Sequence, residues 1–239
     1  MILGGVPWYL NLCDPSRTPE QNAKVLLFSN LGKLFRETEQ LFVSHFGKNP
    51  AYQKVVEYLG VHRFSHRKPL VKAGGMKSGG GASDILEDLE LAGFIESYSS
   101  IHLADSKRLV RYRLADPFLR FYYHFVAPLR KRIEREGEVD LPIALPPHKY
   151  ASWRGVAFEH LCMQHIRYIA KALDFAAVGY QEGAYFGRED LERAVQVDLL
   201  IKRDDRVFVL CEIKYSENLG PQVITEVKRK IENFPNPKG

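Results

Sequence analysis

Apolar and polar positions alternate with a helical period through most of the first half of the chain. Residues that can be buried recur every three or four positions, which is the spacing of a helix with one face turned to a core. The segments with this pattern are 19–28, 33–46, 50–60 and 82–92. Between the last two lies a basic stretch, 62–81, that we expect to be a loop. Gly93 ends the last of these helices, and two short strands, 94–103 and 108–114, are expected to pair after it.

The element order in residues 48–136 is that of a winged helix followed by a connecting helix. The connecting helix begins at Asp116-Pro117, and its dense aromatic residues indicate burial. The next segment, GEVDLPIALPPH, is rich in proline and cannot continue a helix. We therefore place the main domain boundary in residues 137–149.

The second half of the chain combines helical and strand periods, which predicts an α/β domain. A long helix is expected over 153–173, with apolar residues at spacings of three and four. Three strands are expected after it, at 176–181, 194–202 and 206–215. The last helix spans about 221–233, where Val223, Val227 and Ile231 repeat every four residues.

Composition narrows the class of protein without identifying it. The chain has 239 residues, 45% of them hydrophobic and 26% charged, which is an ordinary globular balance. A formal net charge of +5 and a pI near 9.0 permit an acidic partner such as nucleic acid but do not require one. The three cysteines lack the spacing of metal ligands. No apolar run approaches the roughly 18 residues of a membrane span, and the first residues lack the pattern of a signal peptide. We expect a cytoplasmic protein with no membrane partner.

The most informative segment is the expected hairpin around residues 194–216. Its second strand, VFVLCEIKY, is an almost continuous apolar run in which charged residues are costly. Glu212 and Lys214 are two positions apart and project from one face, where an acid beside a base is cheaper than either alone. Asp198, in the first strand, shares that face only if the connecting loop has an odd number of residues or a bulge corrects the register.

These residue types suit a metal-dependent phosphodiesterase site. Asp198 and Glu212, with the backbone carbonyl of Ile213, offer the hard oxygen ligands that Mg²⁺ or Mn²⁺ prefers. Lys214 could activate or orient the attacking water, or stabilise the charge that develops on the phosphate. The alternative is a buried ion pair that only fixes the sheet.

Four sequence features, taken together, resemble one protein family. They are the hairpin QVDLLIKRDDRVFVLCEIKYS, the helix start Gly155-x-x-Phe158-Glu159, the segment YRLADPFLRFYYHF and the opening GGVPWYL. The combination resembles the C-terminal half of prokaryotic AAA/STAND-type ATPases of the archaeal ATPase family. In that family a P-loop ATPase core is followed by a lid, a winged helix and a PD-(D/E)XK nuclease-like domain.

The resemblance implies a division of the chain and a site. The division is a helical lid remnant in 1–47, a winged helix with its connecting helix in 48–136, and a restriction-endonuclease-like α/β domain with a mixed sheet in 150–239. Asp198, Glu212 and Lys214 would form the core triad of the site. Glu159 would be an additional acid from the first helix of that domain. Val197 stands where the nominal motif has proline.

The implied function is Mg²⁺-dependent hydrolysis of phosphodiester bonds in DNA, in a chain without the ATPase core that the family has before Gly4. The family would also have a further strand where this sequence ends at FPNPKG. Two other interpretations stay open. One is a nuclease-like module that binds DNA or protein without catalysis, and the other is a fragment of a split or decayed ATPase gene. A separate ATPase core or another protein would then be a partner.

The glycine-rich segment AGGMKSGGGAS does not have the pattern of a phosphate loop. Gly74 and Gly79 have the required spacing, but Gly80 stands where the motif needs lysine. We therefore expect no ATP site, no ATP hydrolysis by this chain, and no cofactor besides the divalent cation.

The expected winged helix has two interpretations. Its second helix, SDILEDLELAG, is acidic on the surface that would face phosphates, which argues against binding in the DNA groove. The acidic residues are Asp84, Glu87, Asp88 and Glu90. The basic residues that could still contact the DNA backbone are Lys72, Lys77, Lys107, Arg108 and Arg111. The alternative is a contact with protein, or a linker role.

Overall fold

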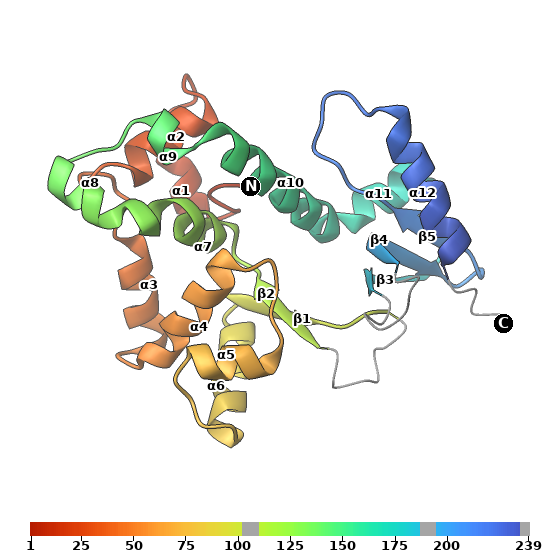
Figure 1. The fold of residues 1–239 in the computed structure, drawn as a ribbon, viewed down its shortest axis with the longest axis horizontal. Coiled ribbons are helices and arrows are strands. Elements are labelled where there is room, and N and C mark those ends of the chain that lie inside the picture. The colour runs from red at the N-terminus through yellow and green to blue at the C-terminus, as the bar shows by residue number, and fades with distance from the viewer. Residues whose placement is uncertain (102–109, 187–194, 235–239) are drawn as a thin grey trace. The chain divides into compact units, whose positions relative to one another are not determined.

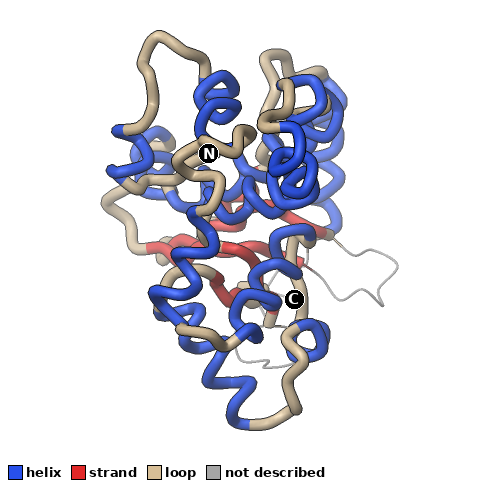
Figure 2. Tube along the Cα trace, turned by 90° about the vertical axis from the view of Figure 1, so that its left-hand side faces the viewer, coloured by secondary structure: helices blue, strands red, loops and turns tan. Residues whose placement is uncertain are grey.

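Helices predominate in this mixed α/β protein, and both of its small sheets are antiparallel (Figure 1). Figure 2 colours the elements by kind and shows how little of the chain is extended. The computed structural model describes residues 1–101, 110–186 and 195–234. The chain forms two compact units: the first comprises residues 1–97 and 111–153, and the second 98–110 and 154–239.

Short helices open the first unit. They are α1 (Pro7–Asn11), α2 (Pro19–Leu27) and α3 (Glu37–Phe46). Thr18 and Gln21 cap α2 reciprocally, because the side chain of each accepts a hydrogen bond from the backbone N–H of the other. Leu34 and Phe35, which lie in the helix predicted over 33–46, are fully buried in the turns before α3.

The next segment places three helices before a two-stranded sheet. The helices are α4 (Pro50–Val61), α5 (Arg67–Ala73) and α6 (Gly80–Leu91), and the strands are β1 (Ile95–Tyr98) and β2 (Arg111–Leu114). An isolated antiparallel bridge between Ser65 and Tyr112 joins the α4–α5 connection to β2. The predicted loop over 62–81 therefore contains a helix, α5, whose Leu70 and Val71 are buried.

The aromatic segment after β2 is helical throughout but changes its hydrogen-bonding geometry. It runs through α7 (Pro117–Phe121), a π-helical turn (Tyr122–Val126), a 3-10 turn (Ala127–Leu129) and α8 (Arg130–Glu136), and α9 (Leu141–Ala144) follows. Its aromatic side chains are buried in the core of the first unit. The ring of Phe121 lies 6.1 Å from that of Phe28 and 5.2 Å from that of Trp153, measured between centroids. The burial expected from the aromatic content is thus present.

The second unit is built around a three-stranded antiparallel sheet. Before the sheet come α10 (Pro147–Gln164), which starts in the first unit, and α11 (Ile166–Ala172). The strands, in their order across the sheet, are β3 (Tyr180–Phe186), β4 (Gln196–Arg203) and β5 (Phe208–Cys211), and α12 (Pro221–Asn233) follows. The expected mixed sheet differs from this arrangement, because the described strands pair only in the antiparallel sense.

Each face of this sheet has its own hydrophobic core. Ala170 of α11 belongs to the cluster that buries Leu199 and Ile201. Phe234, directly after α12, packs against the cluster that buries Leu200. Neighbouring residues of β4 therefore enter different cores, as alternation along a strand requires.

The predicted bounds of the long helix and of the first strand in this unit differ from the structure. The helix expected over 153–173 starts earlier and is interrupted at His165, between α10 and α11. The strand expected over 176–181 begins at Tyr180 instead, because the preceding residues form turns. In those turns the Phe175 N–H donates to the carbonyl of Ala170 at 3.0 Å, which extends the end of α11.

Candidate functional site

The β4–β5 hairpin brings Asp198 and Glu212 to the same end of the two strands. The paired residues are Leu199↔Cys211, Leu200↔Leu210, Ile201↔Val209 and Lys202↔Phe208. Continuing this register by one position sets Asp198 opposite Glu212. The loop inside the last pair, residues 203–207, has an odd number of residues, so the register meets the condition derived from the sequence.

The turn of the hairpin is longer than a two-residue turn at Asp204-Asp205 would be. The N–H of Arg203 donates to the carbonyl of Val207 at 2.9 Å, and Arg206 adopts a left-handed backbone with φ of 69°. A strict two-residue turn would have put Asp198 and Glu212 on opposite faces, and this longer turn avoids it.

A register shift in the sheet lies at Asp198. The pairs Gly183↔Leu200 and Tyr185↔Val197 leave Ala184 opposite two residues of β4, Asp198 and Leu199. Such an irregularity is a β-bulge, which increases local twist and redirects side chains. The side chain of Asp198 thus leaves the sheet at a bulge.

The carboxylate of Asp198 takes a position in the hydrogen-bond ladder beyond the end of β5. Its Oδ2 accepts a hydrogen bond from the backbone N–H of Ile213 at 3.1 Å. β5 consequently ends at Cys211, earlier than the predicted 206–215, because a side chain and not the backbone of β4 receives that N–H. The segment with Glu212 and Lys214 is therefore non-strand backbone held by Asp198.

Glu212 is bound by two lysine side chains. The ammonium of Lys214 donates to its Oε1 at 2.5 Å, and that of Lys230 donates to its Oε2. The exposed fraction of the side chain is 5% for Glu212, 40% for Lys214 and 12% for Lys230. Burial acts to raise the pKa of Glu212, but the bonds and charges of the two ammonium groups outweigh it and leave the pKa lowered. Glu212 is therefore a mostly buried carboxylate that stays ionised.

Lys230 is the site residue that the sequence interpretation missed. The predicted apolar repeat of the last helix placed Ile231 on the inner face, but Ile231 is 54% exposed. Lys230 is mostly buried, and it also approaches Glu226, one turn earlier on α12, at 3.6 Å. Helical spacing was the signal that could have identified it, since positions 223, 227, 230 and 234 follow a 3.6-residue period more closely than 223, 227 and 231.

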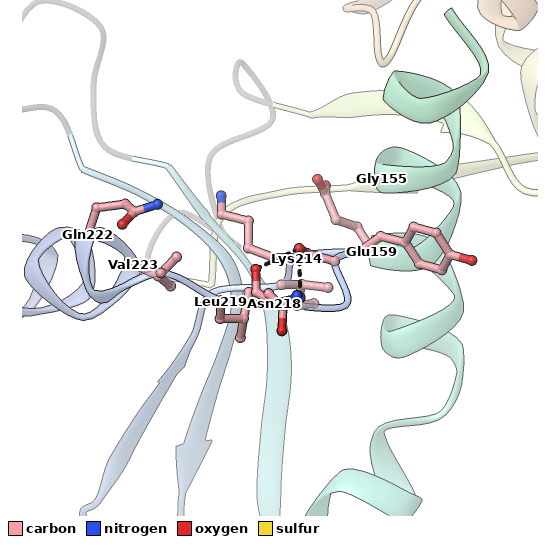
Figure 3. A pocket seen from close by; sticks show the side chains of 11 residues that line it. Gly155, Glu159, Lys214, Asn218, Leu219, Gln222 and Val223 are labelled. Carbon is pink, nitrogen blue, oxygen red and sulfur yellow. Dashed lines mark hydrogen bonds between the residues drawn. The ribbon is translucent and has the colours of Figure 1, made fainter. Parts of the chain in front are cut away.

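A pocket of about 340 Å³ lies beside these charges and brings Glu159 and Lys214 together (Figure 3). α10 contributes Gly155 and Glu159, and the segment after β5 contributes Lys214. The first residues of α12, including Gln222, complete the lining. Asp198 and Glu212 are not among the residues that line this pocket. Of the four predicted site residues, the pocket therefore brings together only Glu159 and Lys214.

Tyr215 anchors the segment after β5 to α10. Its ring contacts that of Phe158 edge-on, with centroids 5.5 Å apart, and the guanidinium of Arg154 lies 5.1 Å from its centroid. Because Phe158 is adjacent to Glu159 and Tyr215 to Lys214, these contacts fix the two pocket residues relative to each other.

The basic residues predicted to contact nucleic acid have different environments. Lys72 and Lys77 are exposed in the first unit. Lys107 and Arg108 lie outside the described residues. Arg111 is buried, with its guanidinium 4.0 Å from the centroid of the Phe64 ring, so it is not presented to a nucleic acid. That part of the prediction is wrong, because Arg111 opens β2 and packs inward.

Asp198 and Glu212 are the described residues of this site that could hold a hard divalent cation. Among the described residues, no group of three or more histidine, cysteine, aspartate or glutamate side chains could hold a metal. Mg²⁺ and Mn²⁺, however, are commonly held by one or two carboxylates together with water and substrate oxygens. The charges of Asp198 and Glu212 both act on Lys214, and two ammonium groups bond to Glu212, which marks a position favourable to positive charge.

Comparison of the chain with protein-family models, with curated proteins and with solved structures gives no match. Within the described residues, none of the helices combines the length and the apolar content needed to cross a membrane.

Proposed function

We propose that the second unit is a nuclease-like domain that hydrolyses phosphodiester bonds in DNA with Mg²⁺ or Mn²⁺. The observation that carries the proposal is the register of the β4–β5 hairpin, which, continued by one position, sets Asp198 opposite Glu212, while Lys214 lines the adjacent pocket. Asp198 and Glu212 would hold the cation, and a bound cation would supply charge stabilisation at the phosphate and a more acidic water.

The lysine and glutamate of the pocket would act on the nucleic acid directly. Lys214 is 40% exposed and has a flexible stem, so its ammonium can leave Glu212 and approach a phosphate oxygen in the pocket. There its positive charge would stabilise the negative charge that develops on the phosphate. Glu159, which lines the pocket from α10, would hold a water molecule or accept a proton from it.

Cleavage of supercoiled plasmid DNA tests this proposal. Wild-type protein should nick the plasmid with Mg²⁺ or Mn²⁺ and not with EDTA, and Lys214→Ala or Glu212→Gln should lower the rate at least about 100-fold. Lys202→Ala, which changes an exposed lysine of β4, is the matched control and should retain the wild-type rate. Equal rates of cleavage by wild type and Lys214→Ala would exclude the catalytic role assigned to Lys214.

A second candidate function is a nuclease-like module that binds DNA or protein without cleaving DNA. The observation in its favour is that both oxygens of Glu212 already accept hydrogen bonds from lysines, so the carboxylate is satisfied without a metal, as in a structural ion cluster. In that case plasmid cleavage is absent under all metal conditions, while Glu212→Gln still destabilises the fold.

We further propose that α4, α5, α6, β1 and β2 form a winged helix. The three helices precede a two-stranded wing, and the Ser65–Tyr112 bridge supplies the short strand contact between the first helix pair and the wing. The exposed acids Asp84, Glu87 and Asp88 lie on α6, the helix that would enter a DNA groove. This charge favours contact with a protein, such as a separate ATPase core, over groove binding.

A further inference from the structure

We propose that Lys230 regulates cation binding at the candidate site by competing with the divalent cation for Glu212. The inference rests on the proposed function, because it assigns Glu212 to the cation. It adds a residue of α12 to a site that the hairpin and α10 otherwise form.

The contacts of the two lysines at Glu212 are unequal. Lys214 is 40% exposed and lines the pocket, so it can move its charge into solvent. Lys230 is 12% exposed and faces a carboxylate that is 5% exposed. Moving an ammonium away from a mostly buried carboxylate costs more where solvent is less accessible. Lys230 is therefore the stronger competitor of a cation.

Glu226 provides a second acceptor for the Lys230 ammonium. Its Oε1 lies 3.6 Å from Nζ of Lys230, and its side chain is 39% exposed. A small rotation of the lysine side chain would exchange Glu212 for Glu226 without leaving the ammonium unpaired. When a divalent cation binds Glu212, Lys230 would transfer to Glu226, which lowers the cost of displacing it.

The formal charges of the cluster give the direction of each effect. Asp198, Glu212, Glu226, Lys214 and Lys230 carry three negative and two positive charges. Replacing Lys230 with a neutral residue leaves more uncompensated negative charge beside the cation position. Replacing Glu226 with glutamine removes negative charge and also the alternative acceptor. The first change should tighten cation binding and the second should weaken it.

Binding of Mn²⁺ to the full chain without DNA tests the proposal, measured by calorimetry or by the loss of the free Mn²⁺ EPR signal. Lys230→Met should bind Mn²⁺ about tenfold more tightly than wild type, and Glu226→Gln should bind it several-fold more weakly. Lys230→Arg keeps the positive charge and should stay near wild type. The matched controls are Lys228→Met and Glu232→Gln, exposed residues of the same helix that should each change affinity less than about twofold.

The outcomes separate this inference from the proposed function. If wild type binds Mn²⁺, Glu212→Gln abolishes binding and Lys230→Met binds like wild type, the role of Lys230 is overturned while the cation site stands. If wild type and Glu212→Gln bind Mn²⁺ equally weakly, the cation site itself is rejected. The proposed competition by Lys230 is then rejected as well. Circular dichroism verifies the fold of each variant; should Lys230→Met not fold, an unchanged Mn²⁺ affinity of Glu226→Gln would suffice to overturn the proposal.

Discussion

Asp198 has a structural task in addition to its proposed chemical one. Its carboxylate accepts the Ile213 N–H beyond the end of β5 and so positions the segment that carries Glu212 and Lys214. Asparagine keeps an oxygen acceptor at this position and loses only the charge, whereas alanine loses both. We expect Asp198→Ala to lower the free energy of unfolding by about 1 kcal/mol and Asp198→Asn by less than half of that. Urea unfolding measures the difference; equal losses would mean that charge, and not the hydrogen bond, holds the segment.

Glu212 links the stability of the second unit to pH. Burial raises its pKa, but the bonds and charges of Lys214 and Lys230 lower it below the ordinary value of 4.5. A lowered folded-state pKa stabilises the fold fully above about pH 4.5, and this stabilisation is lost as the pH falls through the folded-state pKa. Glu212→Gln should lower the free energy of unfolding near pH 7 by about 1–3 kcal/mol.

Chemical unfolding of wild type and Glu212→Gln across the acid range checks this expectation. The difference between the two proteins should shrink as the pH falls, because the wild-type carboxylate becomes protonated and resembles the amide. A difference that stays constant from neutral to acid pH would contradict the ionised state assigned to Glu212.

The sequence predicts the charged residues of the hairpin better than their partners. Glu212 and Lys214 could be identified because an acid and a base two positions apart in an apolar strand are costly unless they interact. Helical spacing could have placed Lys230 on the inner face of α12, but its contact with Glu212 could not be identified, since Glu212 lies 18 positions away and the contact depends on how α12 packs. The hydrogen bond of Asp198 to Ile213 was equally hidden, because it depends on where the β5 ladder stops.

Helix packing in the first unit depends on a glycine at the contact between α4 and the π-helical turn. A Cβ added at Gly60 would collide with the Cβ of Tyr123, which is in a buried aromatic residue. We expect Gly60→Ala to destabilise the protein by about 1–3 kcal/mol, since overpacking exceeds the gain in helix propensity.

Gly155 of α10 is the matched control for this prediction. It too is inside a helix, but a Cβ there would meet nothing within 4 Å. Gly155→Ala should therefore raise the melting temperature or leave it unchanged, with a gain of at most about 1 kcal/mol. Thermal unfolding of both variants compares them, and equal destabilisation would show that neither effect depends on the contact with Tyr123.

Long amphipathic segments were predictable at the level of elements, and short or side-chain-dependent ones were not. The predicted helices at 19–28, 50–60 and 221–233 agree closely with α2, α4 and α12. α5 has proline near its start and only two consecutive buried residues, so no periodic pattern distinguishes it from a loop. Its stability comes from tertiary contacts, which a local pattern does not contain.

At the scale of the whole molecule, the net charge of +5 does not indicate which surface would meet a nucleic acid. In the first unit, exposed lysines of the α5–α6 region are close in sequence to the exposed acids of α6. In the second unit, Lys214 faces a pocket of about 340 Å³. If DNA binds to the second unit, counterions should be released mainly from the phosphates that contact Lys214 in this pocket.

The salt dependence of DNA binding distinguishes the two surfaces. Removal of one lysine–phosphate ion pair should reduce the slope of log affinity against log salt concentration by about 0.9. We expect Lys214→Gln to reduce the slope by about one, and the double variant Lys72→Gln/Lys77→Gln to leave it unchanged, because the acids of α6 repel phosphates near those lysines. Fluorescence anisotropy of a labelled duplex at several salt concentrations provides the slopes. A decrease of about two in the double variant would place DNA on the first unit and reject the protein-contact role proposed for the winged helix.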